Sequence, residues 1–161
     1  MEGIALSIDP GRIIGWAIIG VTAEAPALWG EIKADSPELI SELSAKMFAA
    51  DLLIIEDQYL DKNADSLIKI AALRGTIEGL WAAVKNYPLG EQVCRVKPAV
   101  WQASLNLSAQ ATRKSRKRAS MIRAKTEAGD TNVSQDAADA ICMGLAIVRR
   151  LKHKERTTKN E

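Results

Sequence analysis

Apolar runs and polar breaks alternate along the first fifth of the chain in the manner of a β-sheet. A β-rich run covers residues 3–8 and ends at Asp9, and a second apolar run resumes at residues 14–20. This pattern predicts a hairpin whose turn spans residues 10–13, with a third strand at residues 28–33.

A helix and a buried strand are expected next. Ser36 is a suitable N-cap, Pro37 suits the first helical position, and apolar residues then recur at helical spacing. The following apolar run, residues 52–55, leads directly into Glu56, a carboxylate at the end of a buried strand. Because a helix separates this strand from the hairpin, it can return parallel beside the first strand, which would bring Glu56 next to Asp9.

The remaining pattern predicts three more helices and a fifth strand. The longest helix, residues 64–86, is apolar on nearly every side, so it is either enclosed within the domain or covered by a second subunit, and we favour the subunit interface. A strand at residues 92–96 and a short helix at residues 98–105 follow. A last helix begins after Ser134 and runs to about Leu151. The chain therefore belongs to the α/β class.

Length and composition are those of one globular domain. The 161 residues, 47% of them hydrophobic, can bury a single core, which we assign to residues 1–151, with residues 152–161 as a polar, disordered basic tail. No signal-peptide pattern or membrane-spanning run is present, so no membrane association is expected. Cys94 and Cys142 stand apart without metal-ligand spacing, which favours a cytoplasmic protein.

Charge is distributed unevenly along the chain. Residues 1–65 carry a net charge of −8 and residues 66–161 a net charge of +10. The basic half includes seven cations within residues 113–125 with no acidic residue among them. A surface that only aids solubility usually mixes both signs, so this segment favours nucleic-acid binding.

Four carboxylates are expected at the ends of elements: Asp9 and Glu56 after strands, and Asp136 and Asp139 in the first turn of the last helix. Taken singly, Asp9 could begin a turn and the helix acids could offset the helix dipole. If the last helix begins at the same sheet edge, all four converge, and carboxylates so close together require bound cations. Oxygen ligands without Cys or His select Mg²⁺ or Mn²⁺, and two such ions can support phosphodiester cleavage. With the basic segment, these acids indicate a nuclease.

The order of short motifs resembles the RuvC family of Holliday junction resolvases. The motifs are Asp-Pro-Gly at 9–11, Ile-Glu at 55–56, Lys-Asn-Ala-Asp-Ser at 62–66, Leu-Arg-Gly at 73–75 and Gln-Asp-Ala-Ala-Asp-Ala at 135–140. The resemblance implies an RNase H-like fold, a five-stranded mixed sheet flanked by helices. It also implies a Mg²⁺-dependent endonuclease that acts as a homodimer, through the 64–86 helix, to make paired symmetric nicks in four-way DNA junctions.

The resemblance further implies which residues act at the site. Asp9, Glu56, Asp136 and Asp139 match the family's catalytic acids, which hold two Mg²⁺ ions that Mn²⁺ can replace. Lys97 falls where the family has an active-site lysine. A second lysine belongs near position 114 or 117, and the spacing does not choose between Lys114 and Lys117.

The same resemblance suggests the DNA contacts. Tyr59 falls where the family carries a phenylalanine that wedges into the opened bases of the junction, although it could instead be a core aromatic residue. Contacts to branched DNA are expected from Tyr59, Arg74, Arg113, Lys114, Arg116, Lys117 and Arg118.

This chain also departs from the family pattern. The turn from Asp9 to Gly15 is one residue shorter, and Asp57 follows Glu56 where the family has glutamine. We expect Asp57 to point to the opposite side of the strand and not to bind metal. The preferred cleavage sequence, the strictness for four-way junctions and any branch-migration partner stay open.

Two other functions fit the same sequence. One is an RNase H-like nuclease that acts on flaps, replication forks or RNA–DNA hybrids. The other is a DNA-structure-binding protein whose acids only cap helices and turns.

Overall fold

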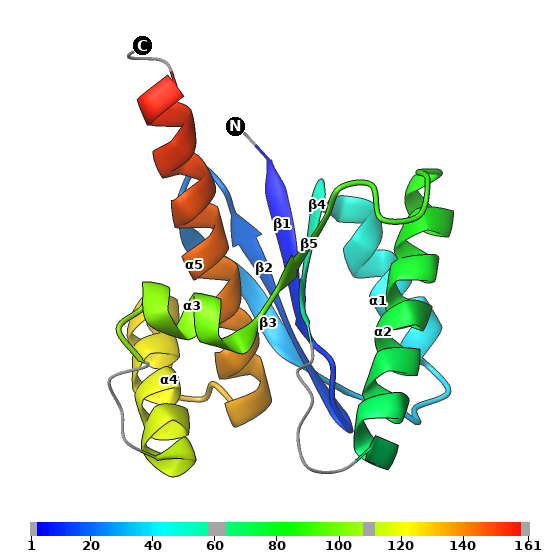
Figure 1. The fold of residues 1–161 in the computed structure, drawn as a ribbon, viewed down its shortest axis with the longest axis horizontal. Coiled ribbons are helices and arrows are strands. Elements are labelled where there is room, and N and C mark those ends of the chain that lie inside the picture. Colours follow the sequence, from blue (N-terminus) through cyan, green and yellow to red (C-terminus); the bar gives the residue numbers. More distant parts are fainter. Residues whose placement is uncertain (1–2, 58–63, 108–111, 159–161) are drawn as a thin grey trace.

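The structure is a computed structural model that describes residues 3–57, 64–107 and 112–158 of the chain (Figure 1). Its strands and helices have the following bounds: β1 Ile4–Asp9, β2 Ile13–Gly20, β3 Ala25–Lys33, α1 Leu39–Ala49, β4 Leu52–Glu56, α2 Ala64–Lys85, β5 Val93–Val96, α3 Pro98–Ser104, α4 Arg113–Ala128 and α5 Gln135–Thr158. The hairpin turn lies between Asp9 and Ile13, as the pattern of the first apolar runs predicts.

The strands form one mixed sheet in the order β3-β2-β1-β4-β5. β1 pairs antiparallel with β2, where Asp9 lies opposite Gly15, and β3 extends the hairpin. β4 lies parallel to β1 and β5 lies parallel to β4, where Val96 is opposite Glu56. The α/β class, the mixed five-stranded sheet and the parallel return of the strand that ends at Glu56 are therefore confirmed.

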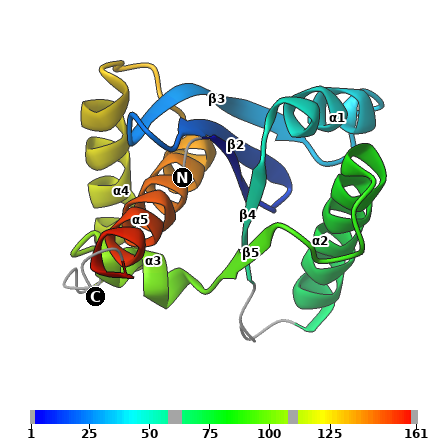
Figure 2. The ribbon, with the colours of Figure 1, turned by 90° about the horizontal axis from the view of Figure 1, so that it is seen from above.

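Helices cover both faces of the sheet. Figures 1 and 2 show α1 and α2 on one face and α3, α4 and α5 on the other. Successive residues of β1 face opposite layers: Leu6 and Ile8 join the core under α1 and α2, while Ala5 joins the core under α5. This two-sided burial explains why the central strands have apolar residues at nearly every position.

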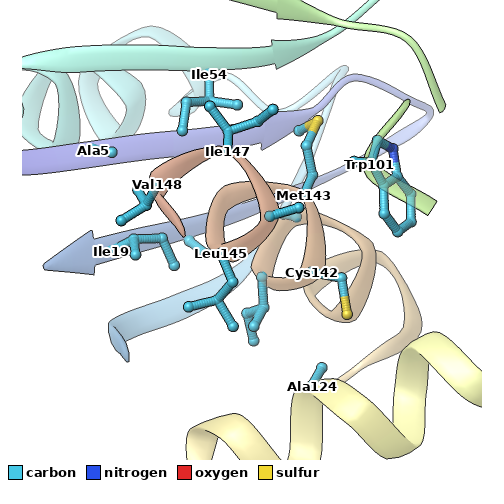
Figure 3. Close-up of a cluster of buried hydrophobic side chains, with 14 of the residues drawn as sticks. Ala5, Ile19, Ile54, Trp101, Ala124, Cys142, Met143, Leu145, Ile147 and Val148 are labelled. Carbon is cyan, nitrogen blue, oxygen red and sulfur yellow. The ribbon is translucent and has the colours of Figure 1, made fainter. Parts of the chain in front are cut away.

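α5 is the central helix of its layer. Every residue from Ala137 to Val148 except Asp139 is buried, because the sheet covers one side of the helix and α3 and α4 cover the others. Figure 3 shows this cluster, with Ala124 of α4 facing Cys142 of α5. Gly144 permits the close packing, because a Cβ there would lie 2.9 Å from the Cβ of Ser7 on β1.

The predicted start of α1 is wrong by about half a turn. The helix begins at Leu39 with Glu38 as its N-cap, whereas the sequence suggests Ser36. The Ser36 hydroxyl instead donates to the Glu38 carboxylate at 2.5 Å, and the chain makes a turn before the helix begins.

The prediction of a disordered tail from residue 152 is also wrong for the part that the structure describes. α5 continues to Thr158, and Lys152 ties this last portion to the β2–β3 turn. Its Nζ donates to the carbonyl oxygen of Thr22 at 3.0 Å and lies 2.7 Å from Glu24 Oε1. Charged contacts of this kind are not visible in the hydrophobic pattern, which ends at Leu151.

α2 is present as predicted but is not buried on every side. Its buried residues are Ile77, Glu78 and Trp81, and Ile68 is 66% exposed. The enclosed alternative is therefore excluded, and the homodimer interface stays a prediction. In the described part of the chain, no helix is both long and apolar enough to cross a membrane.

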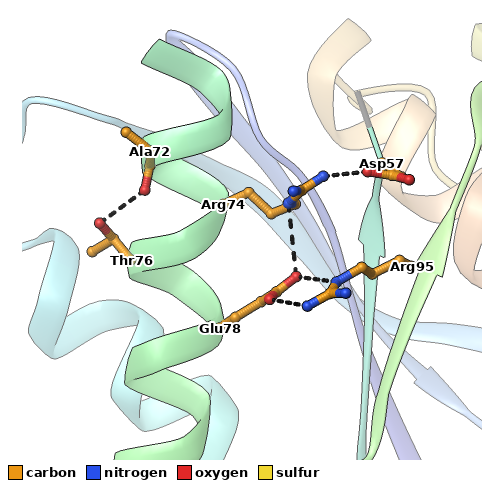
Figure 4. A network of polar contacts seen from close by, with 6 residues as sticks. All are labelled: Asp57, Ala72, Arg74, Thr76, Glu78 and Arg95. Carbon is orange, nitrogen blue, oxygen red and sulfur yellow. Dashed lines mark hydrogen bonds and ion pairs between the residues drawn. The ribbon is translucent and has the colours of Figure 1, made fainter. Parts of the chain in front are cut away.

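A network of charged side chains joins α2 to the ends of β4 and β5 (Figure 4). The Arg95 guanidinium donates two hydrogen bonds to the Glu78 carboxylate, at 2.8 and 2.7 Å. Arg74 donates to Asp57, and its Nε lies 3.8 Å from Glu78 Oε1. Asp57 thus faces α2, on the side of the sheet away from α5, as strand alternation predicts.

Replacing Glu78 by glutamine should lower the free energy of unfolding by about 2 kcal/mol at neutral pH, since a buried acceptor of charged hydrogen bonds is lost. The bonds from Arg95 hold the pKa of Glu78 below its ordinary value of 4.5. This stabilisation is present above that value and is lost as the pH falls through the lowered pKa, so the two proteins should converge in acid. Urea unfolding across a pH series measures the difference, with the exposed Glu91→Gln as control. Equal stability of Glu78→Gln and wild type at pH 7 would contradict the prediction.

Candidate functional site

Four acidic side chains line one cleft at the edge of the sheet. Asp9 ends β1 and Glu56 ends β4, and these parallel strands finish side by side. Asp136 and Asp139 come from the start of α5, whose first turn lies at the same edge (Figure 1). The cleft has a volume of about 430 Å³ and includes all four acids in its lining. The structure therefore brings together the four carboxylates that the sequence places at element ends.

The start of α5 is fixed by a cap and by a glycine. The Ser134 hydroxyl accepts a hydrogen bond from the Ala137 N–H at 3.3 Å, so Ser134 is the expected N-cap. On the strand side, Gly15 lies directly against this turn: a Cβ at position 15 would lie 1.9 Å from the carbonyl oxygen of Asp136. Because Gly15 is also opposite Asp9 in the hairpin, this contact sets Asp136 beside Asp9.

Asp9 is the electrostatic centre of the cleft. Burial raises the pKa of Asp9 well above its usual value, and the neighbouring carboxylates of Glu56, Asp139 and Asp136 raise it further. Lys117 acts in the opposite direction. An acid that is both desolvated and surrounded by like charges is stabilised either by a proton or by a cation. The cleft is thus arranged to attract positive charge.

Neutral side chains donate hydrogen bonds to acids of the cleft, and these contacts were not recognised from the sequence. Gln135 Nε2 donates to Asp139 Oδ1 at 3.4 Å. The indole N–H of Trp101, on α3, donates to Glu56 Oε2 at 2.8 Å. The buried Ser120 hydroxyl, on α4, donates to Asp139 Oδ1 at 2.5 Å. Burial still raises the pKa of Asp139 overall. The sequence does contain one indication of Ser120: it follows Lys117 by three residues, so the two side chains share a face of a helix.

One face of α4 presents cations to the acids. The helix starts with a capping box in which Thr112 and Ser115 exchange side-chain and backbone hydrogen bonds. With the helix so placed, the residues that line the cleft recur at spacings of three and four. They are Arg113, Arg116, Lys117 and Ser120. Lys114 and Arg118 are exposed and do not line the cleft. The structure thus distinguishes the two candidate lysines, placing Lys117 and not Lys114 beside the acids.

The other expected contact residues lie elsewhere. Lys97 follows β5 at the same sheet edge, but its side chain lines a separate groove with Arg150 and Lys154. Arg74 is held between Asp57 and Glu78 on the α2 side of the sheet. Tyr59 lies outside the described residues.

The donor set of the cleft suits a hard divalent cation, since carboxylate oxygens are the ligands that Mg²⁺ and Mn²⁺ prefer. Within the described residues, no three acidic, histidine or cysteine side chains approach closely enough to hold one ion together. Mutual repulsion of carboxylates favours such separation, and it adds to the effect of burial in raising the pKa of Asp9. The residue types therefore fit a divalent cation. For several of these carboxylates to bind one ion together, their side chains would have to move closer to one another.

Comparison with known proteins yields relatives in sequence and in structure. No family model matches the chain. The crossover junction endodeoxyribonuclease RuvC of Haemophilus influenzae is 32% identical over 111 residues, which cover 58% of this chain and 55% of that protein. RuvC of Chlamydia felis is 29% identical over 105 residues, covering 56% of this chain and 62% of that protein. The chain thus aligns with little more than half the length of these curated relatives.

The solved structures extend the similarity to most of the chain. Thermus thermophilus RuvC matches with a TM-score of 0.64, covering 89% of this chain and 92% of that chain at 16% identity. The same enzyme in complex with a Holliday junction substrate gives a TM-score of 0.62 at 16% identity, covering 89% and 90% of the two chains. Fowlpox virus resolvase, solved with Holliday junction DNA, gives 0.57 at 16% identity, covering 92% and 98%. The RNase H-like fold and the resemblance to RuvC are confirmed.

Proposed function

We propose that this protein is a divalent-metal-dependent DNA endonuclease that resolves Holliday junctions. The observation that carries the proposal is the convergence of Asp9, Glu56, Asp136 and Asp139 in one cleft next to a cationic helix face. An acid cluster can bind divalent cations, while cations beside it can hold the phosphates of a nucleic acid. The sequence similarity to RuvC supports this choice among RNase H-like nucleases.

Each group of the cleft has a distinct task in this proposal. Asp9, Glu56, Asp136 and Asp139 would hold two Mg²⁺ ions, which supply an activated water and stabilise the leaving oxygen of the scissile phosphodiester. Arg113, Arg116 and Lys117 bind the phosphates and orient the strand in the cleft. Ser120 restrains Asp139 by its short hydrogen bond.

Paired nicking requires two such clefts, and we propose a homodimer through α2. Most described residues of this helix remain partly or fully exposed in the single chain, including the apolar Ile68. A Cβ at Gly75 or Gly79 would meet no packed neighbour within 4 Å among the described residues, so a second helix could approach closely there. Two clefts related by this interface would act on two opposed strands of one junction.

The experiment that tests the function is cleavage of synthetic DNA substrates by the purified protein with Mg²⁺. We expect symmetric nicks in two opposed strands of a four-way junction, mapped at nucleotide resolution on mobile and fixed junctions. Preferential cleavage of flaps, forks or RNA–DNA hybrids would favour a nuclease of another substrate class. Junction binding without any Mg²⁺-dependent nicking would favour the non-catalytic DNA-binding protein.

Lys117→Ala should reduce junction nicking by about 10² fold, the order found when one preorganised charge-stabilising group is removed from an active site. Lys114→Ala is the matched control, because its side chain is exposed outside the cleft and should affect binding alone. Removing Lys117 also lets the pKa of Asp9 rise further, so the pH dependence of nicking should move to higher pH. A greater loss of nicking in Lys114→Ala than in Lys117→Ala would refute this assignment.

Junction binding supplies a second measurement for both variants. If the replaced lysine contacts a phosphate, the slope of the logarithm of the binding constant against the logarithm of the salt concentration should become shallower by about 1.

A further inference from the structure

The indole of Trp101 makes an unusual contact for a buried tryptophan. Its side chain belongs to the core cluster around α5 and lies beside that helix, and the residue is only 3% exposed (Figure 3). Its N–H, however, does not bond to a backbone carbonyl but to the Glu56 carboxylate, at 2.8 Å. Both residues line the acidic cleft.

We propose that Trp101 is a positioning residue that orients Glu56 for a divalent cation; this inference rests on the proposed function. A carboxylate at a strand end can rotate about its side-chain bonds, and ordering it when an ion arrives costs conformational entropy. A donor anchored in the core removes that freedom in advance. Because the indole is neutral, it fixes the carboxylate without cancelling the negative charge that the ion requires.

The local fold places the indole over Glu56. Val96, the last residue of β5, lies opposite Glu56 in the parallel ladder. Lys97 then caps α3 in an extended conformation, and Pro98 occupies the first turn, so the helix begins at once. Trp101 follows one turn later on the side that faces the cleft and the core. Sheet register and helix start together determine the contact.

Two of the other three tryptophans, Trp81 and Trp16, differ from Trp101 in what their indole N–H contacts. The Trp81 N–H donates to the backbone carbonyl of Glu91 at 3.1 Å, a contact that serves structure only. The Trp16 N–H is buried with no hydrogen-bond partner among the described residues. Of these three indoles, that of Trp101 donates to one of the four clustered acids.

Trp101→Phe removes the N–H while keeping most of the buried ring. Mg²⁺ binding to the full chain without DNA is measured by isothermal titration calorimetry. We expect the Mg²⁺ dissociation constant of the variant to rise by about 10-fold or more, as found for outer partners of metal ligands. Trp16→Phe is the matched control, since it removes an N–H that has no partner among the described residues, and its Mg²⁺ affinity should equal that of wild type. Equal Mg²⁺ affinity of Trp101→Phe and wild type would overturn the proposal.

A second measurement uses the wild-type protein and does not depend on the variant's stability. The four tryptophans give four indole signals in a ¹⁵N–¹H spectrum. These signals are assigned by single replacements with phenylalanine, or by elimination if one variant does not fold. On addition of Mg²⁺ the Trp101 signal should shift and those of Trp16 and Trp81 should not. If wild type binds Mg²⁺ and nicks junctions but the Trp101 signal stays in place, the positioning role of Trp101 is refuted while the proposed function stands. Absence of both Mg²⁺ binding and nicking in wild type would refute the proposed function, and the inference with it.

Discussion

Asp9→Asn is expected to abolish junction nicking and, at the same time, to stabilise the metal-free protein at neutral pH. The loss of nicking should be about 10⁴-fold, the order found when one member of a catalytic group is removed. Asparagine has nearly the same shape but carries no charge, so it cannot replace a carboxylate as an anionic ligand. Junction binding should persist, because the cations of α4 are untouched.

The gain in stability follows from the sign of the pKa shift. Burial, and then the charges of Glu56, Asp139 and Asp136, raise the pKa of Asp9 in the folded protein above its ordinary value of 3.8. At a pH between the pKa of Asp9 in the unfolded chain and its raised pKa in the folded protein, the folded state binds more protons than the unfolded state. The free energy of unfolding of the wild type therefore falls as the pH rises through this range. Asparagine does not titrate, and this decrease should be absent from the variant. Thermal unfolding in EDTA across a pH series measures the difference.

Asp57→Asn is the matched control for Asp9→Asn. Asp57 also follows an apolar strand, but its carboxylate accepts from Arg74 on the opposite side of the sheet. The control should keep nicking and lose about 1 kcal/mol of stability, the reverse of the effect at Asp9. Full nicking activity in Asp9→Asn would remove Asp9 from the site and refute the proposed metal centre.

The positions of the acids could be predicted because topology alone constrains them. Asp9 and Glu56 end two apolar strands, and a helical connection between the strands makes a parallel arrangement available. Parallel neighbours end at the same sheet edge, so their terminal residues meet whatever the details of packing. The start of α5 could be located from Ser134 and the helical periodicity that follows it. These are local signals combined with a general rule of connection.

The contacts made by the acids could not be predicted, since they depend on tertiary packing. Trp101 and Ser120 reach Glu56 and Asp139 from helices 45 and 19 residues away in the sequence. Choosing Lys117 over Lys114 required the orientation of α4 relative to the sheet. The continuation of α5 past Leu151 depends on the contacts of Lys152 with the β2–β3 turn. In each case the contact joins residues that are far apart in the sequence, and the spacing of hydrophobic residues carries no information about such contacts.

Gly15→Ala should be among the most damaging single substitutions in this protein, although it adds only one methyl group. The new Cβ would lie 1.9 Å from the Asp136 carbonyl oxygen and 2.3 Å from its carbonyl carbon. These atoms belong to backbone, so relief requires the start of α5 to move away from β2 by about 1 Å or more. We expect the free energy of unfolding to fall by about 3 kcal/mol, at the upper end of the usual cost of overpacking. Denaturant unfolding measures this effect.

The same displacement should reduce nicking by about 10² fold in the variant that remains folded, because misplacement of a reacting group by 1 Å has effects of that size. Gly20→Ala, at the other end of β2, is the matched control: a Cβ there would make only ordinary van der Waals contacts, the nearest being the Ala23 Cβ at 3.5 Å, and alanine lowers the entropy of the unfolded chain. It should therefore keep or increase stability. If Gly15→Ala were as stable and active as wild type, the close contact between β2 and α5 would not set the position of Asp136. The acid cluster would then owe its geometry to the Ser134 cap and the packing of α5 on the sheet alone.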